Sequence, residues 1–330
     1  MHDGLERVEP GTAGIRRKVA GRGFSYLSAN GRRIRSERLL ERIRQLAIPP
    51  AWTEVWIASS PKAHIQATGV DAAGRTQYLY HARWREVRDD EKFIRSLAFA
   101  QRLPVLRRIV TRDLKQTQDP RRRALAAAVR LMDRAGLRIG GVAYAQENGS
   151  FGATTLLKRH VETESHTVHL HFSGKSAGTW DVTISDPLLA DYFSSLPRTP
   201  GSGPAICHAV ASGRRKQWTA VSDTEVNAYL GDVAGHGFTA KDFRTWQGTV
   251  VAAVSLGRAQ RAGATSPAAV TAAIQEAADW LHNTPAVARD SYVNPRVIAL
   301  FERGVVANPG HRPDRAVLDL LLDGREGHRG

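Results

Sequence analysis

Short apolar stretches separated by turn residues fill the first ninety residues, a pattern typical of β-strands. Gly23–Leu27 is extended and leads into an Asn30-Gly31 turn. One helix interrupts the strands, with apolar residues at helical spacing between Ser36, a suitable cap, and Pro49-Pro50, which ends it. The sequence therefore predicts a β-rich N-terminal domain over residues 1–90. Its further strands are expected at 54–59, 64–69 and 76–81.

From residue 91 onward the pattern becomes mainly helical. Residues 121–135 carry one apolar stripe, and Gly136 is placed to end that helix. Alternating apolar residues over 166–184 predict a β-hairpin whose tip spans 173–178. The sequence therefore predicts an α+β fold, with a mainly α domain over residues 91–330 and a loose tail after about 323. Capping residues predict further helix starts at Ser222, Thr239, Ser266, Thr284 and Asn294.

The charge balance narrows the class of partner. The 330 residues include 47 Lys and Arg against 32 Asp and Glu, a net charge of +15 that favours binding to nucleic acid. A basic membrane-binding protein could look similar, but we find no basic amphipathic helix, lipidation signal, signal peptide or apolar run of the roughly 18–20 residues that a bilayer requires. The single cysteine, Cys207, fits a reducing compartment, so we expect a cytoplasmic protein.

Cutting a DNA strand without a metal ion requires a nucleophile, fixed cationic donors for the phosphate oxygens and a general acid for the leaving oxygen. Arg138 follows the helix that ends at Gly136, and Lys175 occupies the hairpin tip. Lys241 and Arg244 share one face near the start of a helix. Taken singly, each of these residues is more typical of a solvated surface charge.

Two further candidates lie at a helix junction. Asn283 precedes Thr284-Pro285, and Tyr292 follows nine residues after Asn283 on the short helix expected there. A tyrosine in such a place is more often a packing residue than a nucleophile. Both side chains nevertheless supply residue types that strand cleavage needs, because a phenol can attack phosphorus and an amide can donate to a phosphate oxygen.

Other motifs are incomplete. The Gly174-Lys175-Ser176 triplet resembles a phosphate-binding loop, but position 169 is His where that motif needs Gly. Four histidines cluster near the hairpin, yet no cysteine or helical histidine pair completes a ligand set, and a solvated or DNA-facing strand explains them better. We therefore expect neither a cofactor nor a metal site. The four histidines are His160, His166, His169 and His171.

In order and spacing, the candidate residues resemble those of the type IB DNA topoisomerases, in the compact form found in poxviruses and some bacteria. That family has an Arg after a helix, a Lys on a hairpin, Lys-x-x-Arg on a helix, and His or Asn before Thr-Pro with a Tyr nine residues on. The N-terminal stretch also matches the bacterial members, in Ile48–Trp52, His64–Gly69 and Gly74–His81. The resemblance covers residues 20 to 305. It places the family pattern on Arg138, Lys175, Lys241, Arg244, Asn283 and Tyr292.

One position departs from the pattern of many members, which carry His where this chain has Asn283. Counting from Tyr292 and from Thr284-Pro285 assigns the position to Asn283, although the neighbouring His282 is an alternative. Either side chain can donate a hydrogen bond to a phosphate oxygen.

The resemblance implies a C-shaped DNA clamp, a monomer associated with the nucleoid, whose catalytic domain holds a β-hairpin or three-stranded sheet. Tyr292 would attack the phosphodiester to give a 3′-phosphotyrosyl link. Arg138, Arg244 and Asn283 would hold the phosphate oxygens, and Lys175 would be the general acid. The tyrosines among the implied DNA contacts can also be half-buried residues of the sheet. Those contacts are Gln77, Tyr78, Tyr80, Tyr144, Asn148, Thr155 and Lys241.

Two other classes of protein remain open at this point. A tyrosine recombinase shares the catalytic fold and the Arg, Lys, Arg, Tyr chemistry. Recombinases usually have His-x-x-Arg at the second arginine, whereas this chain has Lys241-Asp-Phe-Arg244, and their N-terminal domains are helical. A non-catalytic basic DNA-binding protein would bind DNA but leave its supercoiling unchanged.

Overall fold

The chain divides into two units, Met1–Lys92 and Phe93–Gly330, which we call unit 1 and unit 2. The predicted domain boundary, between residues 90 and 91, lies two residues from this division. No helix in the described part of the chain is long and apolar enough to span a bilayer. The structure is a computed structural model, and it describes residues 4–174, 178–197, 201–212, 215–308, 310 and 312–323.

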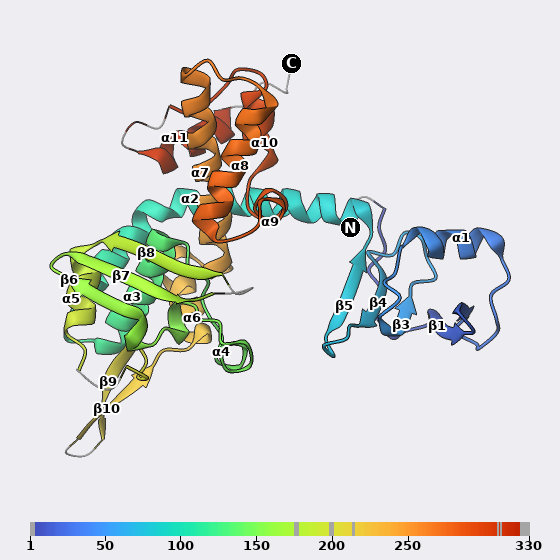
Figure 1. Ribbon diagram of the computed structural model, residues 1–330, viewed down its shortest axis with the longest axis horizontal. Helices are drawn as coiled ribbons and strands as arrows, with labels where there is room; N and C mark the ends of the chain where they lie inside the picture. The colour runs from blue at the N-terminus through green and yellow to red at the C-terminus, as the bar shows by residue number, and fades with distance from the viewer. Residues whose placement is uncertain are drawn as a thin grey trace. The chain divides into compact units, whose positions relative to one another are not determined.

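The described part of unit 1 contains the predicted antiparallel sheet and the predicted helix, and it ends with the first residues of a second helix (Figure 1). The strand order is β2-β1-β3-β4-β5. Strand β1 escaped prediction because three of its six residues are charged in succession, so it shows no apolar alternation. The elements are β1 (Ile15–Ala20), β2 (Gly23–Leu27), α1 (Glu37–Gln45), β3 (Thr53–Ile57), β4 (Ile65–Val70) and β5 (Thr76–Tyr80).

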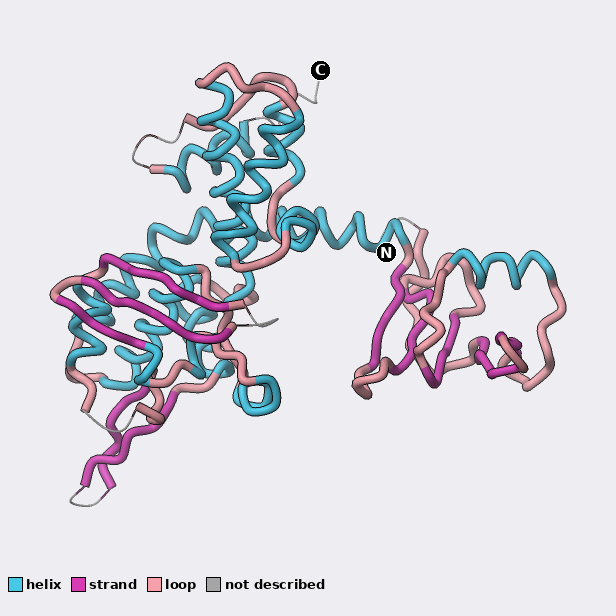
Figure 2. Tube along the Cα trace, viewed as in Figure 1, coloured by secondary structure: helices cyan, strands magenta, loops and turns pink. Residues whose placement is uncertain are grey.

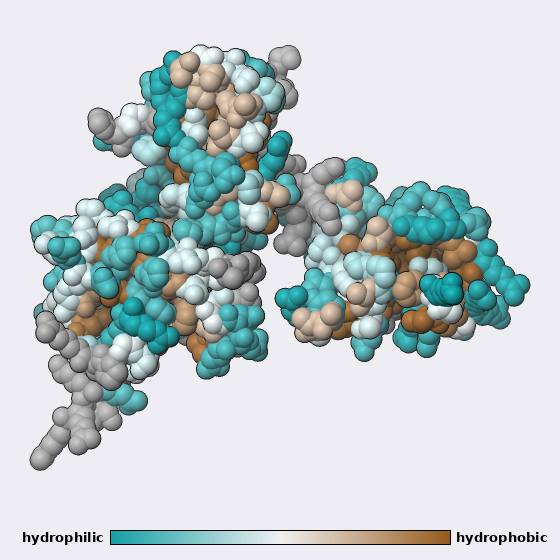
Figure 3. All heavy atoms as spheres, in the orientation of Figure 1, coloured by the Kyte–Doolittle hydropathy of each residue, from teal (hydrophilic) through white to brown (hydrophobic). Residues whose placement is uncertain are grey.

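The core of unit 1 lies between α1 and the sheet. Ile43, the one fully buried residue of α1, packs with Ile15, Val55 and Ile57 of the strands. Hydrophobic residues of this unit lie beneath the hydrophilic outer face of α1 in Figure 3. Ser36 stands at the N-cap as predicted, although its side chain makes no capping hydrogen bond.

Unit 2 combines helices with two small antiparallel sheets, of order β6-β7-β8 and β9-β10 (Figure 2). The predicted hairpin is β7–β8, and β6 extends it to three strands. The elements are α2 (Ala82–Lys115), whose first residues belong to unit 1, α3 (Pro120–Ala135), α4 (Val142–Asn148), the 3₁₀ turns η1 (Ala153–Thr155) and η2 (Lys158–His160), β6 (Val161–Glu164), β7 (Thr167–Ser173), β8 (Thr179–Ser185), α5 (Pro187–Ser194), β9 (Cys207–Ser212), β10 (Arg215–Ala220), α6 (Asp223–Ala234), α7 (Ala240–Arg261), α8 (Pro267–Leu281), α9 (Pro285–Ser291), α10 (Pro295–Phe301) and α11 (Pro313–Asp323).

The predicted helix starts in unit 2 are confirmed. Ser222 and Glu225 form a reciprocal capping box at α6, since each side chain bonds the backbone N–H of the other. Thr284 and Asn294 accept hydrogen bonds from the first turns of α9 and α10. These local contacts decide where the chain turns between α8, α9 and α10, and therefore where Asn283 and Tyr292 stand.

A single large core fills unit 2, and α3 and α7 run through it. Both helices are buried along most of their length, and the three-stranded sheet packs on α3 and α5. Helices α8 and α10 pack on α7. Because α3 precedes Arg138 and α7 carries Arg244, the core fixes both arginines to rigid elements.

Candidate active site

Arg138 lies in the loop that follows α3. Gly136 ends that helix in the left-handed conformation, with φ of 64°, as the sequence predicts. A Cβ atom at Gly136 would overlap the ring of Trp280 on α8. Two features therefore require glycine at position 136. One is its left-handed φ, and the other is the close approach of Trp280, which brings the end of α8 beside Arg138.

Arg244 joins the ends of α3 and α8. Its side chain is buried, at 3% exposed, and donates hydrogen bonds to the carbonyl oxygens of Gly136 and Leu281, the latter at 2.8 Å. Its Nε atom is buried with no hydrogen-bond partner among the described residues. Burial lowers the pKa of Arg244 to about 10, and the charge of Arg138 works in the same direction. The guanidinium still carries its charge at neutral pH.

Asn283 faces Arg138, and His282 does not. Nη2 of Arg138 donates a 2.6 Å hydrogen bond to Oδ1 of Asn283. The amide Nδ2 of Asn283 is buried with no partner in the described part of the chain. The ring of His282 instead stacks on Trp180, with 3.8 Å between ring centroids. The geometry thus favours Asn283 as the residue that accompanies Arg138.

Tyr292 stands immediately after α9 as its C-cap residue, so the expectation that the short helix carries it is off by one position. Its carbonyl oxygen lies 3.0 Å from Oγ1 of Thr249, which also accepts a hydrogen bond from the Asn294 N–H. The phenol ring lies beneath the guanidinium of Arg244, with 5.0 Å from Cζ to the ring centroid. Thr249 on α7 therefore fixes the backbone that presents the phenol to Arg244.

Three positive charges act on the phenol. Burial by itself would raise the pKa of Tyr292, but the charges of Arg244, Arg138 and Lys241 outweigh it and hold the pKa below its ordinary value. Lys241 is exposed in the first turn of α7. Three cationic side chains therefore act on the phenol oxygen of Tyr292, the nucleophile expected from the sequence, and they favour the phenolate form.

Lys175 lies outside the described residues. The strands on either side are described, and Ser173 pairs with Thr179 at the last step of the register. Gly174 donates a 2.7 Å hydrogen bond to the carbonyl of Gly178, which closes the hairpin on both sides of residues 175–177.

The expected DNA contacts divide between the units. In unit 1, Tyr78 and Tyr80 project from one face of the edge strand β5 with their rings stacked 6.1 Å apart, and Tyr78 is 43% exposed. Tyr80 also packs against the buried cluster around Trp56. Gln77 donates to Asp71 at 2.8 Å.

In unit 2, Tyr144 and Asn148 belong to α4, and the side chain of Tyr144 lies outside what the structure describes. Thr155 Oγ1 accepts a hydrogen bond from the N–H of Gly152 in its own turn. That turn is tied to the loop of Arg138, because Ala153 N–H donates to the carbonyl of Arg138. The roles of all these residues toward DNA stay predictions.

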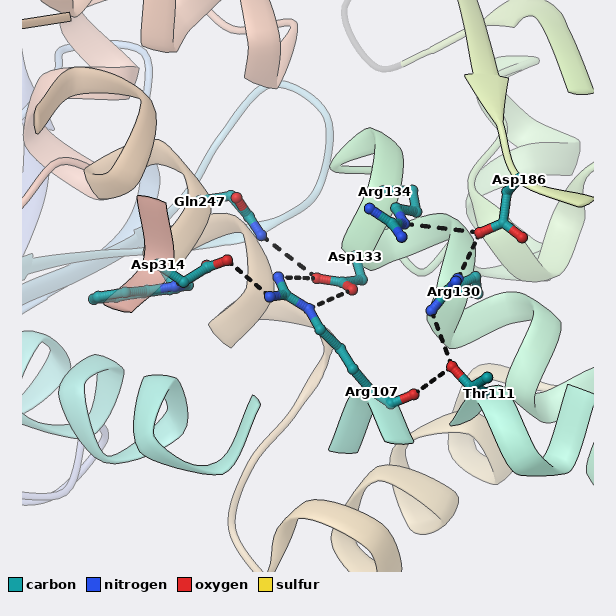
Figure 4. A network of polar contacts seen from close by, with 9 residues as sticks. Arg107, Thr111, Arg130, Asp133, Arg134, Asp186, Gln247 and Asp314 are labelled. Atoms are coloured by element: carbon teal, nitrogen blue, oxygen red, sulfur yellow. Dashed lines mark hydrogen bonds and ion pairs between the residues drawn. The ribbon is translucent and has the colours of Figure 1, made fainter. Parts of the chain in front are cut away.

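A partly buried ion network, which the sequence pattern did not predict, links helices α2, α3 and α11 (Figure 4). Arg107 on α2 donates to both carboxylate oxygens of Asp133 on α3, at 2.9 and 2.8 Å, and to Asp314 on α11 at 2.7 Å. Asp314 also accepts from the indole N–H of Trp246, two residues after Arg244. The available signal was an aspartate beside the apolar stripe of α3, where a charge needs a partner.

No group of three His, Cys, Asp or Glu side chains in the described ranges is placed to hold a metal ion. His169 and His171 instead share Asp181 across the hairpin, at 3.3 and 3.7 Å, and His169 contacts Thr183 at 2.9 Å. The site therefore consists of cationic donors gathered around a phenol.

Two families of known proteins match the chain. Residues 81–297 match the family described as eukaryotic DNA topoisomerase I, catalytic core. Residues 23–71 match the bacterial DNA topoisomerase IB N-terminal domain. The chain belongs to the type IB DNA topoisomerases. The match to the catalytic core spans Arg138, Arg244, Asn283 and Tyr292 and ends before α11.

A topoisomerase of the same type resembles the chain over nearly its whole length. DNA topoisomerase 1B of Acanthamoeba polyphaga mimivirus is 29% identical over 314 residues, which cover 94% of this chain and 93% of the viral protein. The similarity between this topoisomerase and the viral protein therefore extends into both units of the chain.

Proposed function

We propose that the protein relaxes supercoiled duplex DNA by cutting one strand with Tyr292, allowing rotation and resealing the strand. The observation that carries the proposal is a pair of buried donors that have no acceptor among the described residues, Nε of Arg244 and Nδ2 of Asn283, beside a phenol whose pKa is lowered. Buried donors without acceptors are costly, and a phosphate oxygen would satisfy them.

The proposed cleavage step is an in-line displacement at phosphorus. Tyr292 loses its proton to water, and its oxygen bonds to phosphorus while the bond from phosphorus to the 5′ oxygen breaks. Lys175 gives a proton to that 5′ oxygen, which leaves as a hydroxyl, and the 3′ end remains attached to Tyr292. Arg138, Arg244 and Asn283 donate to the non-bridging oxygens as negative charge develops there.

Resealing is the reverse of this step. The 5′ hydroxyl attacks the phosphotyrosyl phosphorus, and Tyr292 leaves. Because the covalent link retains the free energy of the original phosphodiester, the cycle requires no ATP. The guanidinium groups of Arg138 and Arg244 supply positive charge of the kind that a metal ion provides in other strand-cutting enzymes.

We further propose that the protein acts as a monomer whose two units bind opposite faces of the duplex. We also propose that it works in the cytoplasm, on the DNA of the nucleoid. The net charge of +15 supports DNA as the partner. The stacked pair Tyr78 and Tyr80, of which Tyr78 is exposed, supports a contact from unit 1.

The direct test uses negatively and positively supercoiled plasmid in EDTA without nucleotide. Relaxation of both plasmids supports the proposal, and a strict requirement for Mg²⁺ or ATP contradicts it. The matched control is Tyr292→Phe, which keeps the ring beneath Arg244 but lacks the nucleophile. This variant should bind duplex DNA with nearly normal affinity, since affinity comes mainly from many phosphate contacts, yet form no covalent adduct.

A further inference from the structure

One indole connects the hairpin to the segment that carries Asn283. Trp180 on β8 is 3% exposed and lies between two other rings. Phe172, its partner in the β7–β8 register, stacks at 5.7 Å with an interplanar angle of 6°. His282 stacks at 3.8 Å with an angle of 23°. The chain thus places a continuous aromatic stack between β7 and the residue immediately before Asn283.

The same indole supports the end of the hairpin. A Cβ atom at Gly174 would overlap Nε1 and Cδ1 of Trp180, so the backbone of residue 174 rests directly on the ring. The carbonyl of Gly174 accepts a 3.0 Å hydrogen bond from Ser150, and its N–H bonds Gly178. The described residues on both sides of the tip are therefore anchored to Trp180 and its neighbours.

His282 occupies a backbone conformation that does not favour histidine. It is the C-cap of α8 with φ of 47°, in the left-handed region where glycine is the usual residue. A non-glycine residue there costs about 1 kcal/mol or more. The ring compensates for this cost, because it stacks on Trp180 and hydrogen-bonds the backbone of Thr179 on β8. The position therefore holds an aromatic side chain that stacks on the hairpin and hydrogen-bonds its backbone.

We propose that His282 is a positioning residue that sets the hairpin, through Trp180, at the correct distance from Asn283. This inference rests on the proposed function, in which Lys175 on the hairpin protonates the 5′ oxygen while Asn283 holds the same phosphate. A general acid works only within hydrogen-bond reach of its oxygen, and a misplacement of about 1 Å can cost on the order of 10²-fold in rate. One residue that touches the hairpin and adjoins Asn283 couples these two requirements.

The ionisation state of His282 suits this role better than direct phosphate binding. Burial and the charges of Arg244 and Arg138 lower its pKa, although Asp279 and the Thr179 hydrogen bond oppose them. The ring is therefore neutral at neutral pH, and it adds no charge to the phosphate site.

The test compares His282→Gly with His282→Phe on two single-turnover cleavage substrates. One carries the ordinary 5′ bridging oxygen, and the other carries sulfur in its place, which leaves without protonation. His282→Gly should be about 10- to 100-fold slow on the oxygen substrate and close to wild type on the sulfur substrate. His282→Phe, which keeps the stack, should be close to wild type on both.

Stability separates positioning from unfolding. Glycine relieves the left-handed strain, so the melting temperature of His282→Gly should not fall. Equal slowing of His282→Gly on both substrates, normal rates on both, or slowing of His282→Phe to the same extent as His282→Gly would each overturn the inference.

The failure of the proposed function has a different signature. If the wild-type protein forms no covalent DNA adduct at Tyr292, the proposed function itself is wrong. If the wild type forms the adduct but Lys175→Ala is not rescued by sulfur, the general-acid role fails and the inference fails with it. Rescue of Lys175→Ala without rescue of His282→Gly overturns the inference alone.

Discussion

Arg138 donates to Oδ1 of Asn283, and this single contact orients the amide. An arginine has no acceptor, so the atom of Asn283 that faces Nη2 at 2.6 Å must be the oxygen. The Nδ2 group then points away from Arg138, and it is buried with no partner in the part of the chain that the structure describes. The pair thus presents donors from both residues, which suits an anion and excludes a cation from the same place.

Asn283 should be replaceable only by a residue that keeps a donor. We expect Asn283→Ala to slow single-turnover cleavage by on the order of 10²-fold or more, because it removes a donor from a preorganised anion site. Asn283→His should keep substantial activity. Asn283→Asp is the matched control, since it has the same shape and can pair with Arg138 but presents oxygen where the amide presents Nδ2.

The expected order of cleavage rates is therefore Asn283 first, then His, with Ala and Asp far behind. Unlike His282→Gly, the Ala and Asp variants should stay slow on the substrate with 5′ sulfur, because the phosphate oxygens still need their donor. A mild Asn283→Ala together with a severe His282→Ala on both substrates would reverse the assignment.

The pKa of Tyr292 should depend on the charge at Lys241. Below this pKa the phenol is protonated and cleavage is slow, so the rate should rise with pH through it. Lys241→Ala removes a positive charge that stabilises the phenolate, which raises the pKa and shifts the rise to higher pH. Lys241→Arg keeps the charge and should leave the profile unchanged.

Two measurements check the effect of Lys241. Ultraviolet difference titration of wild type against Tyr292→Phe reports the phenol in the free protein, and it should ionise below the reference pKa of about 10. The pH dependence of cleavage at saturating DNA reports it in the complex. An identical profile for Lys241→Ala and Lys241→Arg would contradict the electrostatic argument.

Lys175→Ala should slow cleavage of ordinary DNA strongly and cleave the 5′ sulfur substrate nearly as fast as the wild type. The physical reason is that a thiolate is a good leaving group without a proton, so a missing general acid no longer matters. Lys175→Arg is an informative companion, because it keeps the charge but holds its proton far more tightly. Equal defects of Lys175→Ala on both substrates would reduce Lys175 to a DNA-positioning residue.

The ion network of Figure 4 should contribute to stability. The Asp133 side chain is 3% exposed and pairs with Arg107. Burial alone would lower the pKa of Arg107, but the charges of Asp133 and Asp314 outweigh burial and raise it. Asp133→Asn removes one of the two carboxylates that pair with this guanidinium, while Asp314 remains, and should cost about 1–3 kcal/mol in the free energy of unfolding.

The control for Asp133→Asn is Glu276→Gln, which removes an exposed partner of Arg258. Both side chains of that pair are roughly half exposed, at 56% and 45%, so the loss should stay below about 1 kcal/mol. Urea unfolding of the two variants measures the difference. Equal small losses would show that the network of Arg107 is dispensable.

The sequence by itself determined the features that depend on neighbouring residues. Ser222 with Glu225, Thr284-Pro285 and Asn294-Pro295 begin helices because their side chains satisfy the N–H groups of the turn that follows. Gly136 ends α3 because its φ is left-handed. The signals at Thr284 and Asn294 also place Asn283 before α9 and Tyr292 after it. The alternation of apolar residues likewise predicts the two strands of the hairpin.

Tertiary packing decided the contacts between residues far apart in the chain. Arg244 reaches the carbonyl of Gly136 across 108 positions, and Trp180 meets His282 at the far end of α8. Strand β1 joins the sheet although half of its residues are charged. Such contacts depend on how whole helices and strands pack against one another in a common core. Local propensity therefore carries no signal for them, and only the folded chain shows that Asn283, rather than His282, turns toward Arg138.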